Sequence, residues 1–297
     1  MGFLDLHMHS LHSADGQYTP TQLMELCAGA GVQVAALADH NCVRGVAEAM
    51  EAARAYGIRV IPAVELDCEF EDTHIHLLGY GVRHTDPRYE VLTQEVMAED
   101  WARGRALMEN VRALGFRFGD AAVLALANQD IVVGEMLAEV ILADPENEGD
   151  PRLAPYRPGG LRADNPYVNF YWDFCSPGKA AAPPPAARSM DFSAAMALIT
   201  ATGGIGVLAH PGITVGRNRD AIARMAAQGM AGVEVYSSYH SPGDISFFEE
   251  ATRAAGLFAT LGSDFHGKNK PSVRLGAVDC GGREEALLAA LDARLPS

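Results

Sequence analysis

The chain has 297 residues, of which 48% are hydrophobic and 21% charged, and its formal net charge is -15. This length suffices for one large domain or for a domain that carries an inserted subdomain. The acidic charge argues against an extended nucleic-acid surface, because such a surface neutralises phosphates with many Lys and Arg side chains. A small anionic substrate stays compatible with this charge, since bound divalent cations can reverse the sign of the field inside a pocket.

No segment of the sequence indicates a membrane or secreted protein. The N-terminus has no basic stretch followed by an apolar segment, and no run of about 18 or more apolar residues occurs. We therefore expect a soluble, cytoplasmic protein with no membrane partner. The cysteines are odd in number, widely spaced and free of any CxxC pair, so we expect reduced thiols. They are Cys27, Cys42, Cys68, Cys175 and Cys280.

Short apolar runs alternate with helical patterns in both the first and the last third of the chain. Strands are predicted at 3–7, 34–40, 59–66, 74–81, 204–210, 232–238 and 258–266. Helices are predicted at 19–31, 44–57 and 192–202, and after Asn218 and Ile245. This alternation predicts an α/β fold of βαβ units with a parallel sheet, open or closed into a barrel.

A segment of different character interrupts the alternation. From residue 95 to about residue 142 the pattern is helical and rich in Ala, Glu and Met, and residues 144–190 are rich in loop-forming Pro and Gly. We therefore expect one barrel domain formed by 1–95 and 191–297, with a mainly helical cap subdomain inserted at 96–190.

Histidine and carboxylate side chains follow almost every predicted strand. His7 and His9 are two residues apart, so in an extended strand both side chains point to the same side. A lone histidine in such a place is more often structural, but side chains of this kind recur in phase along the chain. They are His7, His9, Asp39, His40, Glu65, His76, His210, Glu234, Asp264 and His266. Because the carboxyl ends of the strands of a parallel βα barrel meet at one mouth, we expect these side chains to converge there.

Several short motifs, in the same order, resemble the polymerase-and-histidinol-phosphatase (PHP) family. They are DLHMHS at 5–10, ADHN at 38–41, Glu65, HLLGYG at 76–81, AHPG at 209–212 and GSDFHG at 262–267. The resemblance implies a distorted (β/α)7 barrel and phosphoester hydrolysis by two or three divalent metal ions. Imidazole mixed with carboxylate favours a transition metal, with Mn first and Fe or Zn as alternatives.

The resemblance also implies a role for each matching residue. One metal is bound by His7, His9, Glu65 and Asp264, a second by Glu65, His76 and His210, and a third by Asp15, His40 and His266. Glu65 bridges the first two. HSLHSADG carries one residue more before its Asp than the commoner HSxxSDG form, so His12 is the alternative to Asp15.

The expected chemistry is attack by a hydroxide that bridges two metals, with no covalent enzyme intermediate. The catalytic residues would be Glu65, His210 and Asp264, and Asp264 would orient the nucleophile.

The inserted segment is expected to select the substrate. Relatives that resemble nucleoside 3',5'-bisphosphate phosphatases carry an SRTHFAR-like motif there, whereas this chain has DIVVGEMLAEV at 130–140, without the Arg and the His. Lys179 in SPGKA matches the Lys of a PGKPxY-like segment, or else it is a solvated loop residue. Further candidates to bind substrate phosphate are Arg217, Asn218 and His240. Arg217 has the alternative of a surface charge at a helix start, and His240 that of a supporting or exposed loop residue.

The segment 165–179 is the most aromatic of the chain, and its rings either pack the insert onto the barrel, which we favour, or wall the substrate pocket. It resembles that of PHP proteins that open a cyclic phosphate of ribose 5-phosphate and then remove the resulting monoester. We therefore favour 5-phosphoribosyl 1,2-cyclic phosphate as the substrate. The alternative is a nucleoside 3',5'-bisphosphate; histidinol phosphate, nucleic-acid ends and a non-catalytic PHP scaffold rank lower.

Overall fold

The computed structural model of the chain describes residues 2–185 and 190–296. Seven strands form one sheet in the order in which they occur in the chain. Their bounds are β1 Leu4–Met8, β2 Val34–Leu37, β3 Arg59–Phe70, β4 Thr73–Tyr80, β5 Ile205–Leu208, β6 Gly232–Ser237 and β7 Phe258–Gly262. Backbone hydrogen bonds join the first and the last strand, from Asp264 N–H to the His7 carbonyl at 2.8 Å and from His9 N–H to the Phe265 carbonyl at 3.0 Å. The sheet is therefore nearly closed into a barrel, and the predicted α/β barrel class is confirmed.

The expectation of a wholly parallel sheet is wrong at β4. This strand runs antiparallel to both of its neighbours, β3 and β5, while the other neighbouring strands pair in parallel. The reason lies in the connection, because β3 and β4 are joined by only Glu71 and Asp72. A parallel pair needs a crossover of a dozen or more residues, so a two-residue link enforces a hairpin. As a result β4 begins at the mouth of the barrel, where the parallel strands end.

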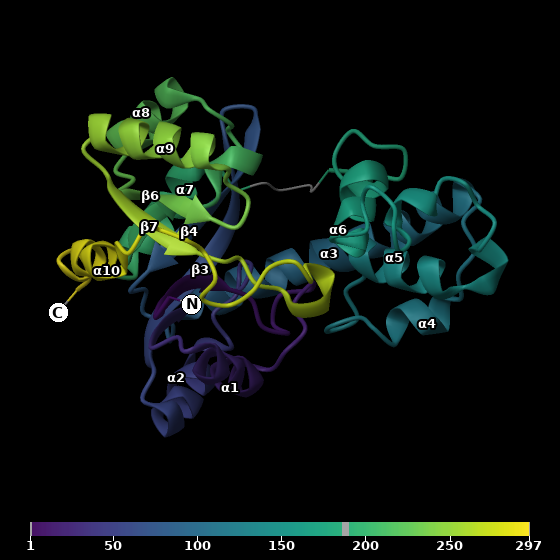
Figure 1. Cartoon of the computed structure of the whole chain (residues 1–297), viewed down its shortest axis with the longest axis horizontal. Coiled ribbons are helices and arrows are strands. Elements are labelled where there is room, and N and C mark those ends of the chain that lie inside the picture. Colours follow the sequence, from purple (N-terminus) through teal and green to yellow (C-terminus); the bar gives the residue numbers. More distant parts are fainter. Residues whose placement is uncertain (1, 186–189, 297) are drawn as a thin grey trace.

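The helices divide into two groups. Around the barrel lie α1 Pro20–Ala30, α2 Val46–Ala53, α7 Phe192–Ala201, α8 Arg219–Ala227, α9 Pro242–Ala254 and α10 Glu284–Asp292. The segment between β4 and α7 contains α3 Pro87–Ala113, α4 Asp120–Leu124, α5 Gly134–Ala143, α6 Pro166–Phe170 and a π-helical turn, η4, Tyr171–Cys175. In Figure 1 α4, α5 and α6 form a lobe beside the barrel, and the long helix α3 leads into it.

Local sequence explains where individual helices begin and end. At the start of α1 the Thr19 hydroxyl accepts from Gln22 N–H and the Gln22 side chain accepts from Thr19 N–H, which is a capping box. Gly31 ends this helix with a φ of 82°, a conformation that glycine adopts without steric cost. Ser241 and Asp244 form a second capping box at the start of α9.

Two hydrophobic clusters correspond to the two lobes. The barrel cluster contains Leu6, Val64, Leu78, Val207, Val233 and Leu261 among other buried residues. The other contains Leu107, Val111, Phe116, Leu137, Ile141 and Phe170. The helix α3 begins at Pro87, so it runs across the predicted limit at residue 96, and the division of the chain into domains stays a prediction. Among the described residues, no helix is long and apolar enough to cross a membrane.

Candidate metal centre

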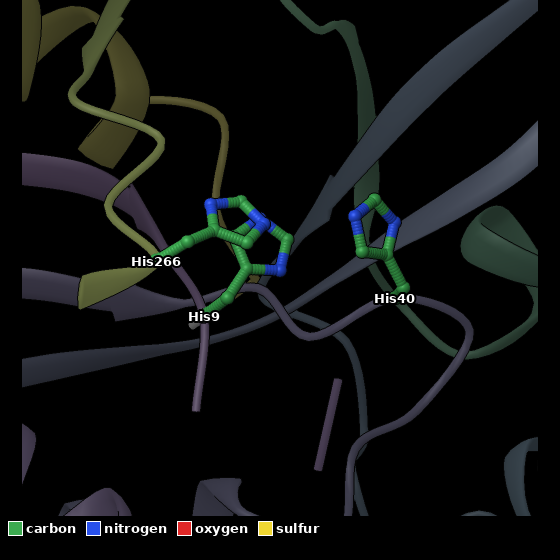
Figure 2. Close-up of side chains that lie close together, drawn as sticks. All are labelled: His9, His40 and His266. Atoms are coloured by element: carbon green, nitrogen blue, oxygen red, sulfur yellow. The ribbon is translucent and has the colours of Figure 1, made fainter. Parts of the chain in front are cut away.

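The side chains that the sequence marks as ligands gather at the barrel mouth. His7 lies on β1, Glu65 on β3 and His76 near the start of β4, while His210 follows β5 and Asp264 follows β7. His76 reaches the mouth because β4 is antiparallel, not because it ends a strand. Figure 2 shows His9, His40 and His266, which come from three different loops, with their rings directed toward one shared region.

The first group of donor atoms comprises His7, His9, Glu65 and Asp264, and all four side chains are buried. The Nε2 atoms of His7 and His9 lie 3.1 Å apart. Glu65 Oε2 lies 3.2 Å from each of these nitrogens, and Asp264 Oδ1 lies 3.0 Å from that of His9. These four residues are the ones that the family resemblance assigns to one metal.

The hydrogen bonds around the two imidazoles assign their tautomers. His7 Nδ1 lies 3.0 Å from Glu234 Oε1, so it carries the proton. His9 Nδ1 lies 3.0 Å from Ser13 Oγ, whose own hydrogen is donated to Asp39 Oδ1 at 2.9 Å. Ser13 must therefore accept from His9. It follows that, when both rings are neutral, their Nε2 atoms present lone pairs to each other, an arrangement that repels unless a proton or a metal ion lies between them.

Two carboxylate oxygens of this group lack hydrogen-bond donors. Glu65 Oε2 and Asp264 Oδ1 are buried and have no hydrogen-bond partner among the described residues. Buried polar atoms are rarely left without partners, because desolvation without a compensating bond costs about 1–3 kcal/mol, and more for a charged group. Two imidazole lone pairs and two carboxylate oxygens thus converge with no donor of their own, which fits a divalent transition metal ion.

A second group meets the other oxygen of Glu65. Glu65 Oε1 lies 3.0 Å from His76 Nδ1 and 3.0 Å from His210 Nε2. The two oxygens of one carboxylate therefore face two different sets of imidazoles. This geometry suits the bridging role that the sequence predicts for Glu65, and the role itself stays a prediction.

A third group comprises His9, His40 and His266. His266 Nδ1 donates to the Asp264 carbonyl at 2.9 Å, so its Nε2 carries a lone pair, and that lone pair lies 3.1 Å from Asp15 Oδ2. Two acceptors again face each other, as a shared cation would require. Asp15 therefore reaches this group, whereas the ring of its alternative, His12, lies beside Gly45.

The electrostatics of the centre keep its carboxylates ionised. Burial raises the pKa of Glu65, but the charges of His7, His76 and His40 outweigh burial and hold that pKa well below its usual range. Burial likewise raises the pKa of Asp264, and Lys270 leads the groups that bring it well below its usual range. Both residues are thus available as anionic ligands at neutral pH.

Comparisons with known proteins indicate which proteins this chain resembles. The PHP domain profile matches residues 5–118. The 3',5'-nucleoside bisphosphate phosphatase of Chromobacterium violaceum is 29% identical over 276 residues, which cover 90% of this chain and 88% of that protein. Residues 5–118 therefore resemble the PHP family. The solved structure of an amidohydrolase from Chromobacterium violaceum, with bound sulfate and no metal, covers 97% of both chains with a TM-score of 0.78 and 25% identity.

Two further PHP relatives differ in the reaction that their names give. A 5'-3' exoribonuclease of Haemophilus influenzae is 27% identical and covers 88% of this chain and 89% of its own length. A phosphoribosyl 1,2-cyclic phosphate 1,2-diphosphodiesterase of Eggerthella lenta is 25% identical and covers 89% of this chain and 94% of its own length. The names of these two relatives and of the bisphosphate phosphatase describe the cleavage of phosphate esters.

Asp67 lies among the histidines of the candidate centre, although it is absent from the predicted ligands. Its Oδ1 lies 3.2 Å from His40 Nδ1 and 3.3 Å from His76 Nε2, and its Oδ2 accepts from Asn41 Nδ2 at 2.7 Å. Asp67 therefore links the second group to the third. The signal was present in the sequence, because Asp67 is two residues after Glu65 and a strand places such residues on one face.

Lys270 and Tyr239 hold the outer oxygen of Asp264 and were also missed. Lys270 Nζ lies 2.7 Å from Asp264 Oδ2, and the Tyr239 hydroxyl donates to the same oxygen. Burial lowers the pKa of Lys270, but Asp264 leads the groups that raise it well above its usual value, so the side chain stays a cation. Asp264 Oδ1 is left to face His7 and His9. A lysine six residues after a ligand aspartate gives no sequence signal of its own.

Two of the carboxylates that recur along the predicted strands, Asp39 and Glu234, lie behind the centre. Glu234 accepts from His7 Nδ1 through Oε1, and from His210 N–H at 2.8 Å through Oε2. Asp39 accepts from the Ser13 hydroxyl and from Ser10 N–H. Such partners fix the orientation of imidazole ligands.

Most of the candidate substrate-binding residues form hydrogen bonds within the protein. Arg217 Nε donates to Asp244 Oδ1 at 2.8 Å, and Asn218 caps α8 by accepting from Ala221 N–H. The ring of His240 is buried, with Nδ1 donating to the Val235 carbonyl and Nε2 accepting from Gly212 N–H. These contacts agree with the structural alternatives for Arg217 and His240. Lys179 is exposed after η4. Contact of these four residues with substrate stays a prediction.

The aromatic segment packs differently from the favoured interpretation. The rings of Phe170 and Phe174 lie 5.5 Å and 5.2 Å from that of Phe116, in edge-to-face contact within the insert. These two rings therefore stabilise the core of the insert and do not attach it to the barrel. The attachment uses polar contacts instead, such as Ser272 N–H donating to Asn165 Oδ1 at 3.0 Å.

Proposed function

We propose that this PHP-family phosphoesterase hydrolyses 5-phosphoribosyl 1,2-cyclic phosphate at both ester bonds in turn, giving ribose 5-phosphate and phosphate. The observation that carries a phosphoesterase centre is the carboxylate of Glu65, whose two oxygens face two separate sets of imidazoles. Two to three divalent ions, with Mn as the best candidate, would be held by the three groups described above. Ions in such groups supply hydroxide at neutral pH and neutralise charge on the phosphoryl oxygens.

The protein's own contribution is to orient and to balance charge. Glu234 holds the proton of His7 on Nδ1, and Asp39 orients the Ser13 hydroxyl that accepts the Nδ1 proton of His9. Lys270 and Tyr239 occupy one oxygen of Asp264, so that only the other faces the reacting region. Asp264 is thereby placed to orient the attacking nucleophile. The buried ammonium of Lys270 also offsets part of the negative charge of the carboxylates and of an anionic substrate.

The preference for the cyclic ester rests on the insert. Residues 130–140 include the turn before α5 and most of that helix, and the buried ionisable side chain there is Glu135, near Asp15. Burial first, and then the charge of Asp15, raise the pKa of Glu135 to about 8. A carboxyl group, neutral or charged, cannot replace the Arg and His that hold a nucleotide phosphate in SRTHFAR-like motifs. The likeness to the Eggerthella lenta diphosphodiesterase supports the same choice.

Arg103 on α3 is our candidate to bind the remote 5-phosphate. Its Nε is buried and has no hydrogen-bond partner in the described part of the chain, and its Nη1 lies 3.6 Å from Asp100 Oδ1. The charges of Asp67, Arg103 and His40 all act on the pKa of Asp100, which places this helix near the centre, and an unpaired guanidinium nitrogen there is suited to a phosphate oxygen. Replacing Arg103 by Met should raise the KM for the 5-phosphorylated ester and leave the KM for a cyclic ribose phosphate without that group unchanged.

The alternative, a nucleoside 3',5'-bisphosphate phosphatase, is favoured by the higher identity to the Chromobacterium violaceum protein. Hydrolysis of RNA ends, as named for the Haemophilus influenzae relative, is opposed by the net charge of -15, because a nucleic-acid track requires cations.

One assay separates these reactions. The Mn-loaded protein is given, in parallel, the cyclic ribose phosphate, a nucleoside 3',5'-bisphosphate, histidinol phosphate and a 5'-phosphorylated oligoribonucleotide. We expect the largest kcat/KM for the cyclic ester, with Asp264→Asn as the inactive control. A nucleotide preferred by several orders of magnitude would overturn the substrate proposal and leave the phosphoesterase proposal intact. No hydrolysis of any ester would overturn both.

A further inference from the structure

We propose that Asn128, a residue of the insert, positions the barrel loop that carries Asp15 and so controls the third metal group. This inference rests on the proposed role of Asp15 as a ligand. Asn128 lies between α4 and α5, whereas Asp15 lies between β1 and α1, so the two residues belong to segments far apart in the sequence.

The contact consists of one side-chain amide and several carbonyls of the Asp15 loop. Asn128 Nδ2 lies 2.7 Å from the Gly16 carbonyl oxygen and 3.2 Å from those of Ser13 and Ala14. An amide nitrogen has two hydrogens, so these three acceptors share them. The acceptors lie on both sides of Asp15, and the bonds therefore fix the direction of the backbone from which its carboxylate projects.

The turn that presents Asn128 is itself tightly held. Gln129 and Asp130 have φ values of 53° and 61°, which non-glycine residues adopt only where the surroundings enforce them. The Trp101 indole N–H donates to the Gln129 carbonyl at 3.2 Å, and Arg44 donates to the Gln129 side chain at 3.0 Å. Asn128 is thus anchored both from α3 and from the barrel, so that it is a rigid support for the loop.

The Asp15 loop has a feature that calls for such a support. HSLHSADG carries one residue more before its aspartate than the family form, and the longer loop has more backbone carbonyls to satisfy. Asn269 donates to the Asp15 carbonyl from the side of β7, and Asn128 holds the loop from the side of the insert. Asp15 then meets His266 at 3.1 Å despite the altered spacing.

Asn128 also explains a second departure from the family. It lies two residues before the stretch 130–140, where the Arg and His of the SRTHFAR-like motif are missing. In this chain the same part of the insert contacts the backbone of the Asp15 loop. The insert thereby acts on the metal centre, so a substitution in the insert would change the affinity for the third ion.

The test compares Asn128→Ala with a matched amide in the insert, Asn110→Ala. Asn110 Nδ2 donates to the Ala182 carbonyl at 3.0 Å and to that of Ala181 at 3.4 Å, so it makes similar bonds away from the Asp15 loop. Mn²⁺ per chain is measured by elemental analysis after equilibration at graded free Mn²⁺, and the bound ions are followed by electron paramagnetic resonance. Asp15→Ala serves as the reference for loss of the third ion.

We expect Asn128→Ala to bind the last ion at least tenfold more weakly and to keep the first two, while Asn110→Ala behaves as the wild type. Asn128→Ser, a smaller change at the same position, should give the same selective loss and covers the case in which the alanine variant does not fold. Wild-type affinity in both folded variants, with one ion lost in Asp15→Ala, would overturn the role of Asn128 and leave the proposed function standing. An unchanged ion count in Asp15→Ala would instead overturn the ligand assignment on which the inference rests.

Discussion

The Nε2 atoms of His7 and His9 face each other across 3.1 Å. Since Glu234 and Ser13 accept both Nδ1 protons, either a proton or a metal ion on the Nε2 side must relieve this contact. We therefore expect removal of metal by a chelator to lower the free energy of unfolding. Ligand binding at a hundred times its Kd stabilises a folded protein by about 2.7 kcal/mol.

Urea unfolding with EDTA or with Mn²⁺ measures this effect. The variant His7→Asn should show a much smaller Mn²⁺-dependent shift than the wild type, because it loses one donor of the first group. An equal shift in the two proteins would contradict the placing of a metal between His7 and His9.

The metal-free and the metal-loaded protein should depend on pH in opposite directions. Burial lowers the pKa of His7, but Glu65, Glu234 and Asp264 together outweigh it and raise that pKa well above its usual value. A group with a raised folded pKa stabilises the fold fully below its unfolded pKa of about 6.5 and loses that contribution as pH rises through the folded pKa. Without metal, the free energy of unfolding should therefore fall from about pH 6 to about pH 8.

With metal bound, the cation takes the place of the proton, so acid competes with it and stability should fall as the pH is lowered. Urea unfolding across this pH range, in EDTA and in Mn²⁺, checks the two slopes. Slopes of the same sign would show that the histidines of the centre do not exchange protons for metal.

Asp264→Asn should abolish turnover in the metal-loaded enzyme, which means that kcat falls by about a hundredfold or more. The reason is that Oδ1 faces His9 at 3.0 Å, and an amide in that position offers either a neutral oxygen or a donor where an anion is required. Steady-state kinetics with the metal content measured in parallel tests this. Asp244→Asn, a change to a carboxylate that pairs with Arg217 at the surface, is the control and should stay active. Near-normal activity of the metal-loaded Asp264→Asn protein would refute the assignment.

Lys270→Met should lower kcat by roughly 10- to 100-fold, the range typical of residues that orient a metal ligand. Its Nζ holds Asp264 Oδ2 at 2.7 Å, and without that cation the carboxylate can turn its second oxygen toward the centre. Lys268→Met is a matched control, because Lys268 pairs with Glu139 at 2.6 Å, away from Asp264. Lys270→Arg should recover part of kcat. Equal kcat values for the two Met variants would exclude this role for Lys270.

The sequence indicated which side chains gather at the barrel mouth, because residue type and strand phase are local properties. His7 and His9 share a face in any strand, and the motifs around His210 and Asp264 mark strand ends without knowledge of the pairing. The direction of β4 was missed because pairing depends on the turn, and Glu71 and Asp72 are not a glycine-rich turn signal. Glu71 nevertheless adopts a φ of 56°, a conformation that the hairpin enforces.

Contacts between distant segments account for the other omissions. Lys270 and Tyr239 meet at Asp264 only because the loops after β6 and β7 fold over the same mouth. Asn128 reaches the Asp15 loop across more than a hundred residues of chain, and its neighbours in sequence indicate only a turn. No periodicity encodes such contacts, since each joins segments that only the tertiary fold brings together.

Asp67→Asn should weaken binding of the later ions by roughly 10- to 100-fold while the first group keeps its metal. Asp67 Oδ1 lies between His40 Nδ1 and His76 Nε2, so its charge supports one imidazole of the second group and one of the third. An amide of the same shape keeps the volume but removes the anion. Metal titration should show the change, with Glu69→Gln, an exposed carboxylate two residues further along β3, as the control. If both variants bind metal as the wild type does, Asp67 is a neighbour of the centre and not a part of it, and the two histidines must be oriented by their own loops.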